Sequence, residues 1–239
     1  MYFPAIFDIF RRMKPKNLVI DCDDTLWENN RYFLAAHDKF VALMGSLGLD
    51  TAEANSLLLR LEMENVVHYG YGARSQARSM ADVYRLLTYD TDETVFSAIE
   101  AIGEEVFHHP VSPLPGVEDT LPRLSESYRL VMFTKGNPDE QMGKIIKSPL
   151  RAYFDHYKVV EEKTPESFGE MLAEFGLAPH ETWMIGDSPK SDILPAIANG
   201  VRSVYIPFSM TWAHEHHELP EHPEIIRIDT FHRLSDLLL

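Results

Sequence analysis

The hydrophobic and polar positions of this chain follow two different periods. Short apolar runs, which suit buried strands, predict strands at residues 17–20, 129–134, 157–160, 182–185, 202–206 and 224–228. Apolar residues that return every three or four positions predict helices at 117–127, 139–146, 165–175, 191–199 and 230–238. Strands that alternate with helices predict an α/β fold, a Rossmann-like parallel sheet with helices on both faces.

Between the first and second predicted strands the pattern is helical throughout. Helices are predicted at 30–47, 50–68, 75–88 and 92–107, and the spacing of Asp50 and Glu53 resembles a capping box. Three prolines between residues 110 and 115 stop the last of these helices. We therefore expect two domains, an α/β core of residues 1–27 and 113–239 and an inserted all-α domain of residues 28–112.

Composition and charge narrow the classes of partner. The 239 residues include 37 acidic and 22 basic side chains, a formal net charge of −15, which argues against binding to a nucleic-acid backbone. No apolar run approaches the roughly 20 residues of a membrane span. The single cysteine, Cys22, excludes an internal disulfide and fits a reducing compartment. We expect a cytoplasmic protein with no nucleic-acid or membrane partner, as either a monomer or a homodimer.

Two segments carry patterns outside this scheme. Residues 1–16 place apolar side chains before basic ones, the reverse of a signal peptide. They predict a short amphipathic helix that docks on the core or on a partner, with a role at a membrane surface as the less favoured alternative. His214, His216 and His217 resemble a metal-binding cluster. Because they lie in a polar stretch with prolines, we interpret them as part of a solvated loop.

Polar residues of different chemical kinds follow four of the predicted strands. Since the carboxyl ends of parallel strands meet at one edge of a sheet, these residues should converge there. Carboxylates suit a hard cation, while a hydroxyl, backbone amides and an ammonium suit anionic oxygens. This inventory indicates phosphoryl transfer, and its members are Asp21, Asp23, Thr134, Lys135, Gly136, Lys163, Asp187 and Asp192.

The order of these residues resembles the haloacid dehalogenase superfamily, and the resemblance covers nearly the whole chain. Its first motif matches Asp21-x-Asp23-x-Thr25, its second Thr134, its third Lys163, and its fourth Gly186-Asp187-Ser188-x-x-x-Asp192. The helical insertion after the first motif matches the cap domain of such proteins. Lys163 is preferred to Lys135 and Lys158 as the third motif because Lys-x-Pro precedes a helix.

The resemblance implies a role for each carboxylate. Asp21 would attack phosphorus and form an aspartyl-phosphate, and Asp23 would protonate the leaving alkoxide and then deprotonate water. Mg²⁺ would be held by the carboxylates of Asp21 and Asp187 and by the backbone carbonyl of Asp23. Asp192 would support the metal site or contact the ion through water. Strand alternation would let Asp21 and Asp23 face the same phosphate.

The remaining residues would hold the phosphate and choose the substrate. Thr134, Lys163 and the amides near Lys135 and Gly136 would bind the phosphoryl oxygens. The glycine-flanked aromatic loop 69–74 is either an ordinary connection between helices or a loop that dips into the site. In the second case Arg74 would pair with a carboxylate or second phosphate of the substrate. Trp27, next to the first motif, is interpreted as a packing residue or as part of the flap.

The function implied is Mg²⁺-dependent hydrolysis of a small phosphorylated metabolite. A phosphomutase shares every catalytic residue and stays open as an alternative. A haloacid dehalogenase or a phosphonate-cleaving enzyme is less favoured, because neither needs an acid at the position of Asp23. A catalytically silent binding protein on the same fold is disfavoured by the intact motifs.

Overall fold

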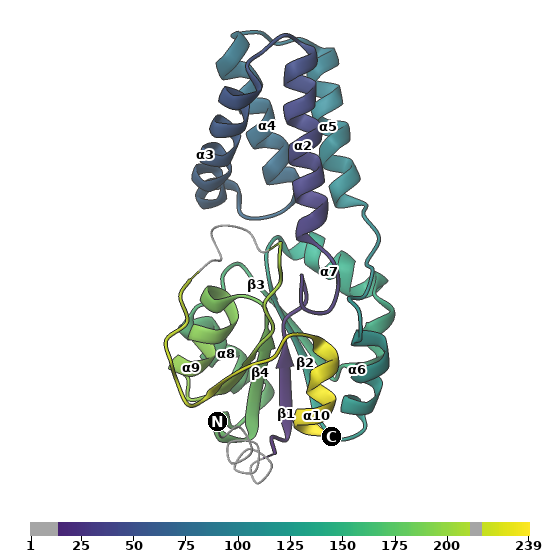
Figure 1. Cartoon of the computed structure of the whole chain (residues 1–239), viewed down its shortest axis with the longest axis vertical. Coiled ribbons are helices and arrows are strands. Elements are labelled where there is room, and N and C mark those ends of the chain that lie inside the picture. Colours follow the sequence, from purple (N-terminus) through teal and green to yellow (C-terminus); the bar gives the residue numbers. More distant parts are fainter. Residues whose placement is uncertain (1–13, 211–216) are drawn as a thin grey trace. The chain divides into compact units, whose positions relative to one another are not determined.

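The computed structural model describes residues 14–210 and 217–239 (Figure 1). The helix predicted for residues 1–16 falls largely outside the described residues, as do His214 and His216. Contacts divide the chain into an α/β unit, made of residues up to Glu28, Val111–Lys135 and Gln141–Leu239, and a helical unit, made of Asn29–Pro110 with Gly136–Glu140. Within the described ranges, no helix has both the length and the apolar character that a membrane span requires.

The described part of the α/β unit contains a six-stranded sheet in the order β3-β2-β1-β4-β5-β6, with every pairing parallel. This confirms the predicted Rossmann-like fold. Leu18, Val19 and Ile20 of the interior strand are fully buried, which explains its unbroken apolar run. The strands are β1 (Asn17–Ile20), β2 (Arg129–Lys135), β3 (His156–Val160), β4 (Thr182–Gly186), β5 (Arg202–Tyr205) and β6 (Ile225–Arg227).

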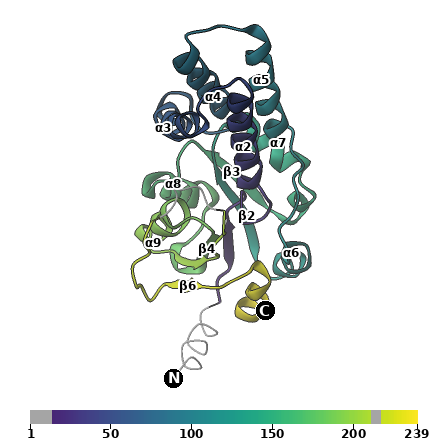
Figure 2. The same cartoon turned by 45° about the horizontal axis from the view of Figure 1, so that its top comes forward.

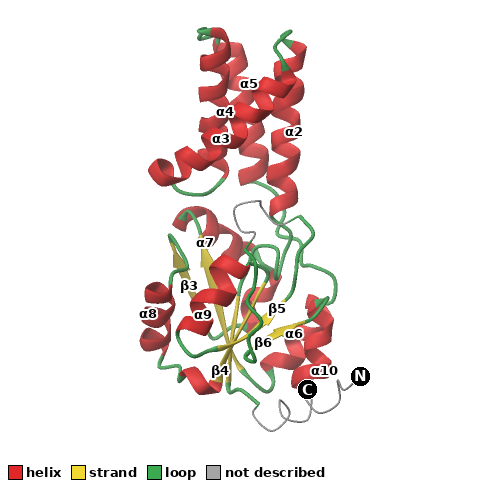
Figure 3. Cartoon of the chain, turned by 60° about the vertical axis from the view of Figure 1, so that its left-hand side comes forward, coloured by secondary structure: helices red, strands yellow, loops and turns green. Residues whose placement is uncertain are grey.

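Alternate residues of β1 enter two separate hydrophobic cores. Leu18 and Ile20 pack with apolar residues of α6 (Val117–Ser125) and α10 (Leu234–Leu238). Val19 packs with residues of α8 (Pro165–Phe175) and α9 (Leu194–Ala198). Figure 3 shows the same division, with α8 and α9 on one side of the strands and α6 and α10 on the other. Ile145 of α7 (Pro138–Lys147) joins the first core.

Two helices predicted as continuous have a mixed structure. The predicted helix 191–199 is a π-helical turn, η3 (Pro189–Ile193), followed by α9. The predicted helix 230–238 begins as a 3₁₀ turn, η5 (Phe231–Arg233), before α10. Two further 3₁₀ turns, η1 (Pro149–Tyr153) and η2 (Pro179–Glu181), were not predicted. Hydrophobic periodicity does not distinguish the i, i+3 hydrogen bonds of a short 3₁₀ turn from the i, i+4 hydrogen bonds of an α-helix.

Four helices make up residues 29–110 of the helical unit: α2 (Asn30–Ser46), α3 (Thr51–Tyr69), α4 (Ala73–Thr88) and α5 (Glu93–Phe107). The Asp50 carboxylate caps α3 by accepting hydrogen bonds from the amides of Ala52 and Glu53, at 2.8 and 3.1 Å. α2 and α4 each contact both α3 and α5, and Figure 2 shows the helices side by side. Their buried faces form a hydrophobic core of their own, which includes Phe40, Met44, Leu58 and Met80.

Candidate active site

The carboxyl ends of neighbouring strands β1 and β4 place two acids at one edge of the sheet. Asp21 follows β1, and its backbone N–H donates to the carbonyl of Ile185 in β4 at 2.9 Å, so the strand pairing extends to the acid itself. Asp187 follows β4 directly. Both side chains are buried, and Thr25 donates its hydroxyl to Asp187 at 3.5 Å.

A third carboxylate, Asp192, completes a buried acidic cluster. One carboxylate oxygen from each of Asp21, Asp187 and Asp192 lies within 4.8 Å of the others. The Lys163 ammonium donates to Asp21 and, at 2.6 Å, to Asp192. The lysine is itself buried, with only 4% of its surface exposed. Three buried carboxylates with one buried ammonium among them leave an excess of negative charge, which a cation would balance.

The pKa values of these groups reflect the same imbalance. Burial raises the pKa of Asp21 to about 7, although the Lys163 ammonium opposes the shift. Burial and the charges of Asp21 and Asp192 raise the pKa of Asp187 well above its usual range. Burial alone would lower the pKa of Lys163, but Asp192 and Asp21 outweigh it, and the pKa lies above its ordinary value. The lysine therefore stays charged.

The π-helical turn after β4 brings Asp192 back toward the strand end. Asp192 accepts a hydrogen bond from the amide of Ser188 at 2.9 Å, on the oxygen that does not face Lys163. The Ser188 hydroxyl in turn accepts from the amide of Ser191 at 3.0 Å. A Cβ atom added to Gly186 would lie 2.3 Å from the Asp192 carboxylate, so only glycine leaves room for this return.

Asp23 is not among the three acids of the cluster and has hydrogen-bond partners of its own. Its carboxylate accepts hydrogen bonds from Trp27 at 2.7 Å, from Gln141 at 2.8 Å and from Lys144 at 2.5 Å. Burial would raise the pKa of Asp23, but the Lys144 charge and these hydrogen bonds lower it overall. β1 ends at Ile20, so the strand alternation expected to align Asp21 with Asp23 does not apply.

The sequence interpretation of Trp27 was incomplete, and Gln141 and Lys144 were not predicted as site residues at all. Trp27 is fully buried, as a packing residue would be, but it is also a hydrogen-bond donor to Asp23. A polar residue on the predicted helix 139–146 carries no signal of its own in a single sequence. Only the short i, i+3 spacing of Gln141 and Lys144 indicates that they share one face of that helix.

The other predicted residues of the α/β unit have different surroundings. Thr134 is buried in β2, one residue before the strand ends. The ammonium of Lys135 lies 3.7 Å from Glu162, and that of Lys158 lies 2.6 Å from Glu174. Lys163, the lysine preferred in the sequence, contacts Asp21.

Comparison with known proteins identifies the family. A model of the haloacid dehalogenase-like hydrolases matches residues 15–200. The chain belongs to this family. The match runs from the start of β1 past the acidic cluster and through the helical insertion, and confirms the resemblance carried by the motifs.

Several members of the haloacid dehalogenase-like family resemble the chain over most of its length. A glyceraldehyde 3-phosphate phosphatase of Pyrococcus furiosus is 27% identical, covering 81% of each chain. One of Methanothermobacter thermautotrophicus is 24% identical over 93% of this chain and 99% of its own. The crystal structure of a haloacid dehalogenase-like hydrolase from Xanthomonas campestris superposes with a TM-score of 0.81 at 28% identity, covering 94% of this chain and 97% of that one.

The acidic cluster of this haloacid dehalogenase-like chain fits a divalent cation. Its ligand atoms are hard carboxylate oxygens within 4.8 Å of one another, the donor type that Mg²⁺ prefers. Burial, together with the charges of the neighbouring acids, raises the pKa values of Asp21 and Asp187, so the ionised carboxylates are costly here and a bound cation would stabilise them. Asp21, Asp187 and Asp192 are therefore suited to hold or support the ion.

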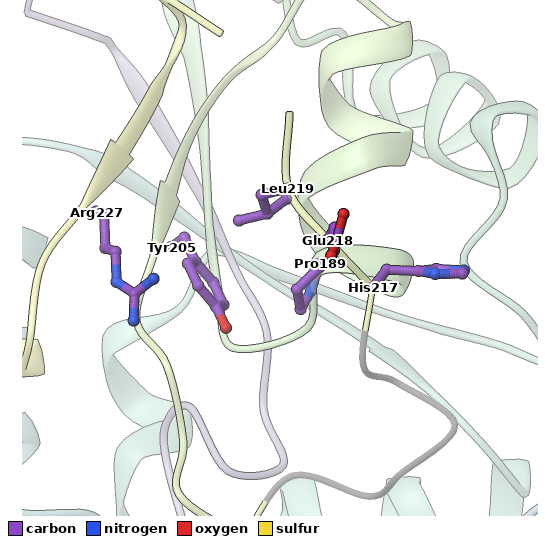
Figure 4. A pocket seen from close by; sticks show the side chains of 6 residues that line it. All are labelled: Pro189, Tyr205, His217, Glu218, Leu219 and Arg227. Carbon is purple, nitrogen blue, oxygen red and sulfur yellow. The ribbon is translucent and has the colours of Figure 1, made fainter. Parts of the chain in front are cut away.

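Two features lie outside the cluster. Arg74, predicted to bind substrate, belongs to the helical unit, where its guanidinium lies 5.0 Å from the centre of the Phe107 ring. A pocket of about 350 Å³ lies in the α/β unit, where Arg227 is next to Tyr205 (Figure 4). None of the acids of the cluster is among its lining residues, which are Pro189, Tyr205, His217, Glu218, Leu219 and Arg227.

Proposed function

We propose that the protein is a Mg²⁺-dependent phosphomonoester hydrolase that acts on a small phosphorylated metabolite through an aspartyl-phosphate. The observation that carries this proposal is the buried contact of Asp21 with Lys163, next to Asp187 and Asp192. A carboxylate held by an ammonium at the edge of a Rossmann-like sheet suits attack on an anionic ester. Relatives named glyceraldehyde 3-phosphate phosphatase support hydrolysis of phosphate esters by this chain.

The reaction divides into two displacements at phosphorus. A carboxylate oxygen of Asp21 attacks, the bond from phosphorus to the ester oxygen breaks, and Asp23 gives a proton to the departing alkoxide. Water then attacks the phosphorus of the aspartyl-phosphate while Asp23 accepts its proton. Inorganic phosphate leaves, and the carboxylate of Asp21 is restored.

Positive charge and hydrogen-bond donors have to surround the transferred group. Thr134, Lys163 and the amides near Lys135 and Gly136 would hold its oxygens. Mg²⁺, bound by Asp21, Asp187 and the carbonyl of Asp23 with support from Asp192, would supply charge stabilisation for the phosphoryl oxygens. Lys163 also keeps Asp21 oriented through their direct contact.

We assign substrate choice to the helical unit, as the cap of the enzyme. The unit has its own core and carries Arg74 near the start of α4, after two glycines with positive φ, Gly70 and Gly72. Arg74 is the second residue of α4 and not part of the loop predicted for it from the sequence. A charged side chain at this start of the helix would pair with a second anionic group of the substrate. The size of the relatives' named substrate, glyceraldehyde 3-phosphate, is compatible with a small metabolite.

Phosphate release from a panel of small phosphate esters tests this proposal. We expect hydrolysis that requires Mg²⁺ and that falls at least about 10³-fold in Asp21→Asn, since loss of a nucleophile removes the covalent route. Asp119→Asn, an exposed acid on α6 of the same unit, serves as the matched control and should keep full activity. Phosphate release that persists in Asp21→Asn, or that proceeds equally in chelator, contradicts the mechanism.

A further inference from the structure

Both oxygens of the Asp23 carboxylate are held by buried or half-buried donors. Trp27 Nε1 lies 2.7 Å from Oδ1, while Gln141 Nε2 and Lys144 Nζ lie 2.8 and 2.5 Å from Oδ2. One donor comes from the turn that follows β1, where the amides of Leu26 and Trp27 donate to the carbonyl of Cys22. The other two come from α7, more than a hundred residues further along the chain.

Packing of α7 against the hydrophobic core holds its two donors, Gln141 and Lys144, in place. Gln141 and Lys144 are three positions apart and therefore share one face of the helix. Ile145, next to Lys144, is fully buried in the hydrophobic core that also contains residues of β1 and α6. The side chain of Lys144 is only 13% exposed, and an ammonium at that depth is costly unless an anion pairs with it. Asp23 supplies that anion.

The side-chain amide of Gln141 is oriented by its hydrogen bond to Asp23. The side chain is 6% exposed, and its Oε1 has no hydrogen-bond partner among the described residues, whereas its Nε2 donates to Asp23. A flipped amide would turn Oε1 toward the carboxylate, oxygen against oxygen. A buried amide that leaves one of its atoms unsatisfied is expensive, so its bond to Asp23 is the contact that accounts for its orientation.

We propose that Lys144, assisted by Gln141, is the positioning residue for Asp23. Three donors on two oxygens fix the plane of the carboxylate, which two rotatable bonds would otherwise leave free. Acid–base transfer depends on the proton lying within hydrogen-bond reach in the correct direction, so a residue that sets the direction of Asp23 sets the rate of its step. This inference rests on the proposed function, in which Asp23 protonates the leaving group. The Lys144 charge and these hydrogen bonds also lower the pKa of Asp23, which by itself would make it a weaker acid catalyst, because less of it is protonated. A selective loss of alkyl activity without Lys144 would therefore mean that orientation outweighs this effect.

Comparing substrates whose leaving groups differ in basicity isolates the role of Lys144 in proton transfer by Asp23. The value of kcat/KM covers binding through cleavage of the ester bond, and a 4-nitrophenolate departs without a proton, whereas an alkoxide needs one. We expect Lys144→Met to lower kcat/KM for 2-phenylethyl phosphate by roughly 10- to 100-fold, a part of what general acid catalysis contributes. It should leave kcat/KM for 4-nitrophenyl phosphate nearly unchanged, and Lys144→Arg should restore most of the alkyl activity. Lys147→Met, an exposed lysine of the same helix, is the matched control and should change neither value.

Asp23→Asn separates failure of the inference from failure of the proposed function. If Asp23→Asn does not lower the alkyl rate selectively, the acid role of Asp23 is wrong. If it does, and Lys144→Met lowers both rates alike or neither, positioning by Lys144 is wrong. In the Asp23→Asn background, Lys144→Met should add no further selective loss, because both changes act through one group. Should Lys144→Met not fold by circular dichroism, Gln141→Leu takes its place with the same expected selectivity.

Discussion

At the scale of single residues, the site depends on how closely Asp192 approaches the end of β4. Its two carboxylate oxygens are bound separately, one by Lys163 and one by the amide of Ser188. Asp192 is 1% exposed and has no solvent into which it could move aside. The space it occupies exists because Gly186 has no side chain. Steric crowding therefore explains the glycine of the fourth motif. A Cβ atom built on Gly186 would lie 2.6 Å from the Cβ atom of Asp192.

We therefore predict that Gly186→Ala damages the site without touching a charge. The added methyl group overlaps Asp192, so the acid has to leave its present position, in which it contacts Lys163. Overpacking of this kind lowers the free energy of unfolding by about 1–3 kcal/mol. Isothermal titration with Mg²⁺ should show weakened binding, and urea denaturation should show the lost stability.

Gly143→Ala is the matched control for this change. Gly143 lies inside α7, and a Cβ atom there meets nothing within 4 Å. Replacing a helix-interior glycine by alanine should raise the free energy of unfolding by roughly 0.5–1 kcal/mol and leave Mg²⁺ affinity unchanged. Unaltered Mg²⁺ binding in Gly186→Ala would show that Asp192 is not needed where it stands.

The residues that carry the acidic cluster could be named from the sequence, but the partners of Asp23 could not. Asp21 and Asp187 each follow a strand with a marked apolar run, and Lys163 lies three residues after the end of β3, so the edge of a parallel sheet brings them together. Gln141 and Lys144 contact Asp23 across 118 and 121 residues. That contact depends on how α7 is rotated on the sheet, and the polar positions of one helix do not encode this rotation.

At the scale of elements, a buried hydrogen bond helps to hold the C-terminal helix in addition to apolar packing. The hydroxyl of Tyr128, just before β2, donates to the carbonyl of Leu238 in α10 at 2.5 Å. Leu234 and Leu238 insert into the core on the α6 face of the sheet. The five residues of α10 are too few to form a helix alone, so this docking is what orders the segment.

The Tyr128 contact predicts a loss of stability in alkali. Burial raises the pKa of Tyr128 above its ordinary value near 10. The neutral phenol therefore contributes stability that is complete below pH 10. This contribution is lost as the pH rises through the higher pKa of the folded state, because the unfolded chain releases the proton first.

Tyr128→Phe should remove that dependence. We expect the variant to lose about 1 kcal/mol at neutral pH, the usual net value of one hydrogen bond, and to follow a flatter stability curve between pH 9 and about 12 than the parent. Urea denaturation at a series of pH values measures both. Parallel curves for the two proteins would mean that Tyr128 does not titrate differently on folding.

At the scale of the whole molecule, the chain forms two units with separate hydrophobic cores, and its tryptophans are distributed unequally between them. The sequence contains three tryptophans, at positions 27, 183 and 212, and none in residues 29–110. Tryptophan fluorescence therefore reports on the part of the chain outside the four helices of the helical unit, while circular dichroism reports on both units. Because the acidic cluster lies entirely in the α/β unit, the two signals can separate an effect of metal on that unit from an effect on the whole chain.

Mg²⁺ should raise the midpoint of the fluorescence-detected thermal transition. At 100 times its dissociation constant, a ligand that binds only the folded state adds about 2.7 kcal/mol, which corresponds to roughly 5–10 °C for a unit of this size. Asp187→Asn should lose this response, yet its midpoint without Mg²⁺ should equal or exceed that of the parent, because the change relieves repulsion among buried carboxylates. NaCl at the same ionic strength controls for screening of the net charge of −15. An equal rise in Asp187→Asn, or in NaCl, would assign the stabilisation to general screening and leave the three carboxylates without a bound ion.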